Sequence, residues 1–157
     1  MNHSAAPCSR RVFLELCLQT GAAGRLLPVL GASVLAGCAS VATRVLPMTN
    51  GLLHVRLGEH PELNVVNGVL RVTPEGSTDS LFVVRTSTDA PLVLSTICTH
   101  LGCAVDLVQG QLVCPCHGST YSLDGTVRRG PAVKPLARYA ARLEPGDVLV
   151  IDLGKSA

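Results

Sequence analysis

The chain has 157 residues, of which 47% are hydrophobic, 15% are charged and 3% are aromatic, and its formal net charge is +2. This length allows one ordinary domain and a targeting segment. The small charge and the few aromatic residues argue against a nucleic-acid surface, which concentrates Lys, Arg and aromatic side chains. We therefore expect no nucleic-acid partner.

Residues 1–37 are predicted to be an export signal. Residues 9–14 read Ser-Arg-Arg-Val-Phe-Leu, which resembles the twin-arginine pattern S/T-R-R-x-F-L, with Arg10 and Arg11 as the arginine pair. An apolar stretch follows, from Leu26 to Cys38. Because this export route moves folded proteins, a domain that uses it often acquires its cofactor before export.

The apolar stretch ends in a sequence that predicts a membrane anchor. Residues 35–38 read Leu-Ala-Gly-Cys, which resembles the lipobox, where cleavage occurs before a lipid-modified cysteine, here Cys38. The alternative is a retained helix, because 18 uncharged residues lie between Arg25 and Arg44, a marginal spanning length. Either anchor would tether the folded domain to the periplasmic, outer face of the cytoplasmic membrane.

Residues 38–50 are predicted to be a linker, with Asn50-Gly51 as a turn, and residues 51–154 the folded domain. Asn67-Gly68 predicts a tight hairpin between two neighbouring strands. The cysteine-rich residues 96–131 look loop-like, so we expect one antiparallel all-β domain with a metal-binding excursion. Strands are expected at residues 52–57, 63–66, 69–73, 81–85, 92–95, 137–143 and 148–153.

Four of the seven cysteines lie within 19 residues, in two short boxes. Residues 98–103 read Cys-Thr-His-Leu-Gly-Cys, and residues 114–119 read Cys-Pro-Cys-His-Gly-Ser. Each box places a thiol and an imidazole on one loop, so two facing loops could share a metal centre. Such cysteine density indicates a metal site, a disulfide or both. A structural zinc site is the competing interpretation, but it would leave two cysteines unexplained.

The two boxes resemble those of the Rieske family, specifically its cytochrome bc-type branch. The resemblance covers about residues 92–151 well and includes Gly130-Pro131-Ala132, the family's third loop. It implies a Rieske-type antiparallel β sandwich with a loop-rich cluster-binding subdomain at about residues 96–136. It also implies one [2Fe-2S] cluster per chain, with four ligands: Cys98, His100, Cys114 and His117.

The same resemblance implies roles for five further residues. Cys103 and Cys116 would form a disulfide that ties the two loops together. The hydroxyls of Ser119 and Tyr121 would donate hydrogen bonds to a cluster sulfide and a ligand cysteine, and so stabilise the reduced state. Leu101 would pack over the cluster and help to exclude water.

The ligand types predict a function in electron transfer. Two thiolates cancel the formal charge of an oxidised cluster, whereas four thiolates would leave it anionic, and a neutral site accepts an electron more readily. We expect one-electron transfer from a quinol, with a cytochrome b-type subunit forming most of the quinol pocket, to a cytochrome c-type acceptor. The chain would then be a subunit or carrier and not a complete enzyme.

Two alternatives stay open from the sequence. The chain could be the electron-transfer subunit of a periplasmic molybdenum oxidase such as arsenite oxidase, or a non-redox metal or disulfide scaffold. Only ten residues separate Cys103 from Cys114, fewer than respiratory-complex members usually have. A stand-alone carrier is therefore an alternative to a complex subunit.

Overall fold

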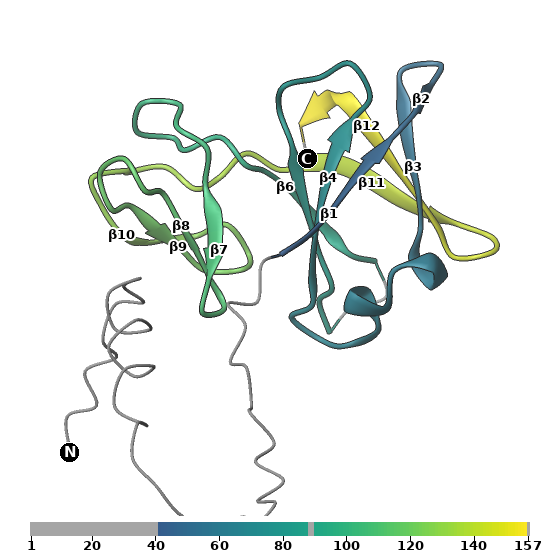
Figure 1. The fold of residues 1–157 in the computed structure, drawn as a ribbon, viewed down its shortest axis with the longest axis horizontal. Coiled ribbons are helices and arrows are strands. Elements are labelled where there is room, and N and C mark those ends of the chain that lie inside the picture. Colours follow the sequence, from purple (N-terminus) through teal and green to yellow (C-terminus); the bar gives the residue numbers. More distant parts are fainter. Residues whose placement is uncertain (1–40, 88–89, 157) are drawn as a thin grey trace, which may run out of the picture. The chain divides into compact units, whose positions relative to one another are not determined.

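The computed structural model describes residues 41–87 and 90–156 (Figure 1). The predicted export signal, with Arg10, Arg11 and Cys38, lies outside these residues. Within them, no helix has the length and apolar character needed to cross a membrane.

Two four-stranded sheets form a sandwich, which we call the base sandwich (Figure 1). The first sheet has the order β1-β4-β5-β6, with β1 (Ala42–Leu46), β4 (Val69–Pro74), β5 (Leu81–Val84) and β6 (Leu92–Ser95). The second has the order β11-β12-β3-β2, with β11 (Tyr139–Glu144), β12 (Val148–Ser156), β3 (Leu52–Arg56) and β2 (Met48–Thr49). The predicted all-β sandwich is thus confirmed.

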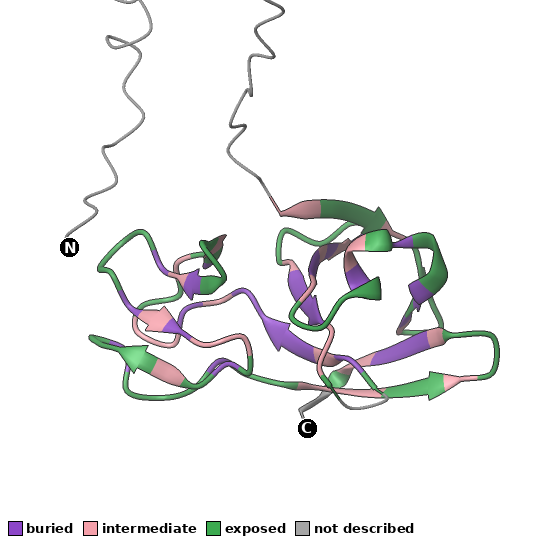
Figure 2. Ribbon diagram, turned by 90° about the horizontal axis from the view of Figure 1, so that it is seen from below, coloured by how far each residue is buried: buried purple, intermediate pink, exposed green. Residues whose placement is uncertain are grey.

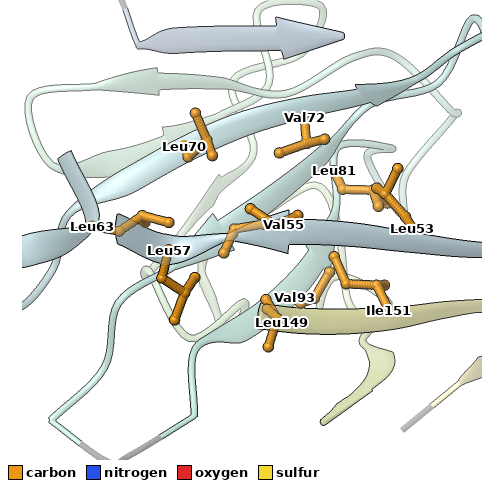
Figure 3. Close-up of a cluster of buried hydrophobic side chains, with 11 residues drawn as sticks. Leu53, Val55, Leu57, Leu63, Leu70, Val72, Leu81, Val93, Leu149 and Ile151 are labelled. Atoms are coloured by element: carbon orange, nitrogen blue, oxygen red, sulfur yellow. The ribbon is translucent and has the colours of Figure 1, made fainter. Parts of the chain in front are cut away.

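Alternating side chains of the two sheets meet in one apolar core (Figure 3). Leu53 and Val55 of β3 face Leu70 and Val72 of β4, and all four are fully buried. In each of these strands one residue separates the two inward-facing side chains, which is the period of a half-buried strand. The core therefore depends on the hydrophobic alternation that predicted the strands.

Strand β5 is buried on both faces, which explains its unbroken apolar sequence. Leu81 and Val83 belong to the base-sandwich core, whereas Phe82 and Val84 belong to a second core. That second core also contains Cys98 and Tyr121, among other residues of the cluster-binding subdomain. The first sheet therefore supports that subdomain on its outer face (Figure 2).

A third sheet lies inside the segment that was predicted to be loop-like. Its order is β10-β9-β8-β7, with β7 (Asp106–Val108), β8 (Gln111–Val113), β9 (Thr120–Tyr121) and β10 (Val127–Arg129). All its pairs are antiparallel. The loop prediction was wrong here because strands of two or three residues are too short to show an alternating pattern.

The predicted linker also contributes to the sandwich. Strand β1 pairs in parallel with β4, and β2 pairs with β3 through a turn at Asn50 and Gly51, both at positive φ. The turn is as predicted. Within the predicted linker the described residues form β1 and β2, and the β1–β4 pair is parallel whereas the other strand pairs of the described residues are antiparallel. Ala42 and Leu46 pack against the base-sandwich core, and this burial holds a segment whose sequence shows no clear strand pattern.

The strand predicted at residues 63–66 is replaced by helical turns. Two 3-10 helices, η1 (Leu57–Glu59) and η2 (Pro61–Asn64), occupy this region, and Leu63 is buried in the core. Pro61 stands at the first position of η2, where its fixed φ suits a helical turn. The hairpin predicted at Asn67-Gly68 is therefore wrong. Instead, the Asn67 amide donates to the Arg85 carbonyl at 2.8 Å.

Gly68 is predicted to be essential because η2 lies directly against it. A Cβ atom at this position would lie 1.8 Å from the backbone oxygen of Glu62. Gly68→Ala should lower the free energy of unfolding by about 1–3 kcal/mol, as overpacking does. Gly58→Ala is the matched control, since nothing lies within 4 Å of its Cβ position. Equal urea midpoints for the two variants, followed by circular dichroism, would contradict the close approach.

Candidate metal centre

The first cysteine box forms a tight loop closed by two backbone hydrogen bonds. The Cys98 amide donates to the Cys103 carbonyl at 2.8 Å, and the Gly102 amide donates to the Cys98 carbonyl at 2.9 Å. Gly102 has a φ of 80°, which glycine adopts without steric cost. The loop therefore presents the side chains between Cys98 and Gly102 on a fixed backbone.

The second box repeats the same construction. The Cys114 amide donates to the Ser119 carbonyl at 2.8 Å, and the Gly118 amide donates to the Cys114 carbonyl at 3.0 Å. Gly118 has a φ of 74°. Two loops of equal length and equal hydrogen bonding thus each carry one cysteine and one histidine of the predicted ligand set.

The four predicted ligands converge, with sulfur inside and nitrogen outside. Cys98 and Cys114 are free thiols, each only 2% exposed. The rings of His100 and His117 pack edge to face with their centroids 4.9 Å apart. His100 is half-buried and His117 is exposed. The structure therefore pairs the two thiols with each other and the two imidazoles with each other.

A disulfide joins Cys103 to Cys116 and links the two loops covalently, with 6.5 Å between the Cα atoms. This is the pairing that the resemblance implied. The Sγ atoms of Cys103, Cys114 and Cys116 lie within 4.8 Å of one another. Because two of the three form the disulfide, this trio offers one thiolate and is not a metal site by itself.

Tyr121 is a buried hydrogen-bond donor to Cys98. Its hydroxyl oxygen lies 3.2 Å from the Cys98 sulfur and accepts the Thr99 amide at 3.2 Å. Burial, and then the hydrogen bond with Cys98, raise the pKa of Tyr121, so the phenol keeps its proton. Burial also disfavours the Cys98 thiolate, but hydrogen bonds led by that from Tyr121 outweigh it and lower the pKa of Cys98.

The pKa of the second thiol, Cys114, is shifted in the opposite direction. Burial and the neighbouring Cys98 raise the pKa of Cys114. Two thiolates in contact in a buried site repel each other, so a cation is needed to hold both in the ionised form. Two buried thiols beside two imidazoles are also the donor set of a Rieske centre. The residues present therefore fit an iron–sulfur cluster.

The third loop is hydrogen-bonded to both cysteine boxes. The Ala132 amide donates to the Ser119 hydroxyl oxygen at 3.0 Å, and the Thr99 hydroxyl donates to the Lys134 carbonyl at 2.6 Å. The Ser119 side chain makes the smallest contribution to the lowered pKa of Cys98. Thr99 is a site residue that the sequence reasoning missed, although its place between Cys98 and His100 in the first box was a usable signal.

Leu101 occupies an exposed position on the first loop. Its side chain is 70% exposed, next to the half-buried His100. Its predicted role in covering the cluster remains a prediction. The structure shows that this apolar side chain is exposed to solvent next in sequence to His100, a predicted ligand.

Comparison with known proteins identifies the family. The family described as "Rieske [2Fe-2S] domain" matches residues 54–140, which is more than half of the chain. The chain belongs to the Rieske [2Fe-2S] domain family. Its cofactor is a [2Fe-2S] cluster, as the sequence predicted.

Curated relatives of this Rieske protein include iron-sulfur subunits of cytochrome b6-f complexes. The cytochrome b6-f complex iron-sulfur subunit of Chlorobaculum thiosulfatiphilum is 44% identical over 75 residues, covering 46% of this chain and 40% of that protein. The subunit of the same name from Chlorobaculum tepidum is 37% identical over 92 residues, covering 57% and 50%. The chain therefore spans half or less of the length of these relatives.

Solved structures support the fold. A quaternary ammonium Rieske monooxygenase, solved in complex with L-carnitine, aligns with a TM-score of 0.52 at 17% identity. The alignment covers 66% of this chain and 32% of that one. At this identity the likeness concerns the fold alone, and it agrees with the Rieske sandwich described above.

The hydrogen bond from Tyr121 should raise the potential of the Rieske centre. Tyr121→Phe removes the donor and keeps the ring. If the bond favours the reduced state by about 1 kcal/mol, a part of the roughly 1.5–3 kcal/mol of a charged hydrogen bond, its loss lowers the potential by about 40 mV. Tyr139→Phe, on β11, is the matched control. Protein-film voltammetry that gives the same potential for both variants would show that the phenol does not tune the centre.

Proposed function

We propose that Cys98, Cys114, His100 and His117 would hold the cluster. The thiols are buried and the imidazoles reach the surface, which suits a centre that exchanges electrons at its histidine side. When bound, the cluster supplies a site for one electron. The remaining chemistry belongs to the side chains that surround it.

The surrounding donors favour a high potential. Tyr121 and Ser119 direct hydroxyl groups at Cys98, and such donors stabilise the additional negative charge of a reduced centre. The disulfide between Cys103 and Cys116 holds both loops in place. We infer a midpoint potential in the upper part of the known Rieske range of about −150 to +300 mV.

The position of the two imidazoles suits quinol oxidation, because His117 is exposed and His100 is half-buried. An imidazole that held the centre through one ring nitrogen would keep its second ring nitrogen free, and that nitrogen could hold or release a proton. His100 and His117 could therefore accept a proton at their outer nitrogens when an electron arrives. This pairing of proton and electron is what the oxidation of a quinol requires.

We propose that the chain takes electrons from a quinol, beside a cytochrome b-type partner, and passes them to a cytochrome c-type acceptor. The identity of the curated relatives, which are cytochrome b6-f subunits, supports this branch over a molybdenum oxidase subunit. One observation carries the proposal: two buried thiols, two imidazoles nearer the surface and the hydroxyl of Tyr121 occur together in the predicted cluster site.

Ligation is tested by removing each imidazole. His100→Ala or His117→Ala should abolish the Rieske electron paramagnetic resonance signal and most of the bound iron, because the centre would lose one of its four protein ligands. His54→Ala, an exposed histidine of β3, should retain both. The intact protein should also be reduced by a quinol when a cytochrome b-type partner is present. Full iron content with an unchanged signal would remove that histidine from the ligand set.

We further propose that the protein is exported and tethered to the periplasmic face of the cytoplasmic membrane, by lipid on Cys38 or by a retained helix. Mass spectrometry of the mature N-terminus should find diacylglycerol on Cys38, and Cys38→Ala should abolish it. A peptide that spans residues 30–45 unmodified would instead support the retained helix. Loss of export in an Arg10→Lys and Arg11→Lys variant would support the twin-arginine route.

A further inference from the structure

Charge is distributed unevenly between the cluster-binding region and the rest of the domain. Residues 96–138 contain four Lys or Arg and only two Asp or Glu. The remaining residues from 41 to 157 contain six Lys or Arg and eight Asp or Glu. The region that carries the cluster is therefore basic, on a domain that is otherwise slightly acidic.

Both acidic groups of this region are engaged within the fold. Asp106 accepts a hydrogen bond from Arg71 of β4 at 2.8 Å, in an ion pair that joins the region to the base sandwich. Asp124 accepts hydrogen bonds from the Ser122 hydroxyl and the Thr126 amide. The guanidinium of Arg138 donates to the Asp124 carbonyl at 2.7 Å. These groups are held by internal contacts.

Three cations of the region face solvent without such contacts: Arg128, Arg129 and Lys134. All three are exposed. None of them takes part in an ion pair among residues 41–87 and 90–156. Their charges therefore project from the surface and are available to a partner.

Backbone contacts place two of these cations beside the histidine loops. Arg129 stands opposite Thr120 in the β9–β10 pair, three residues after His117. The Lys134 carbonyl accepts the hydroxyl of Thr99, the residue before His100. The basic residues therefore flank the loops that carry both imidazoles.

One exposed apolar side chain lies on a histidine loop and another on the third loop, which is hydrogen-bonded to both boxes. Leu101 follows His100 and is 70% exposed, and Val133 precedes Lys134 and is 87% exposed. Transient electron-transfer interfaces are small, with apolar contacts near the centre and polar groups around them. Exposed apolar side chains on these loops, with cations beside them, have this composition.

We propose that this surface, formed by Leu101, Val133, Arg129 and Lys134, is the docking face for an acidic redox protein. The inference rests on the proposed function and specifies the electron acceptor as a cytochrome c-type protein with a negative surface around its haem edge. The opposite charge of that surface would steer the encounter and orient the acceptor toward His100 and His117. An anionic membrane surface would cover the same histidines without offering a redox centre.

The test compares two charge-reversed proteins in the full-length, cluster-loaded form. The first carries Arg129→Glu and Lys134→Glu. The matched control carries Arg44→Glu and Arg56→Glu, which changes the net charge equally at exposed positions of the base sandwich. Oxidation of each reduced protein is followed by stopped flow with two soluble c-type cytochromes of similar potential, one acidic and one basic.

The unmodified protein and the control should react faster with the acidic cytochrome, and salt should slow that reaction. At low ionic strength the first variant should be oxidised by the acidic cytochrome about tenfold or more slowly, which is the scale of electrostatic steering. Its oxidation by the basic cytochrome should become faster. Its electron paramagnetic resonance signal should be unchanged, which excludes misfolding. The reduction potentials of all three proteins would show whether a change in rate comes from electrostatic steering or from a change in driving force.

Two outcomes would overturn the docking face. The first is equal rates with the two cytochromes, or an equal loss in the control. The second is loss of binding to vesicles that contain phosphatidylglycerol with no change in the reaction with the acidic cytochrome, which would assign the cations to a membrane. Failure of the proposed function would look different, because neither cytochrome would oxidise a protein whose cluster signal is intact.

Discussion

Two free thiols in contact in the protein interior are the constraint on which the rest of the structure depends. Cys98 and Cys114 are each 2% exposed, and two thiolates so placed are unstable without a compensating cation and hydrogen-bond donors. The neighbouring residues supply those donors and hold them in place. Tyr121 and Ser119 direct hydroxyls at Cys98, while the disulfide prevents the loops from separating.

The base sandwich makes this arrangement rigid. Because β5 is buried on both faces, one strand belongs to the core of the sandwich and to the core beneath the cluster loops. Arg71 adds a polar link, since it donates to the Val105 carbonyl and to Asp106 and lies over the ring of Phe82. A centre that exchanges electrons benefits from a scaffold that moves little between its two charge states.

Polarity increases from the inside of the site outward. Buried sulfur lies against the apolar core, the imidazoles lie nearer the surface, and the exposed cations Arg129 and Lys134 flank the loops that carry them. This order would let the same two histidines meet a quinol in one complex and an acidic acceptor in another. The apolar Leu101 and Val133 would contribute contact area in either encounter.

The sequence by itself determined the ligand boxes, the family and the long strands, because these depend on local spacing and on alternation over four to six residues. Strand β6 has its predicted bounds, and the paired cysteines follow from the resemblance. Tertiary structure alone decided the parallel pairing of β1 with β4, the helical turn at residues 61–64 and the short third sheet. It also decided the role of Thr99, whose hydroxyl meets a carbonyl 35 residues away. Contacts between distant segments leave no local periodicity in the chain, so only packing could reveal them.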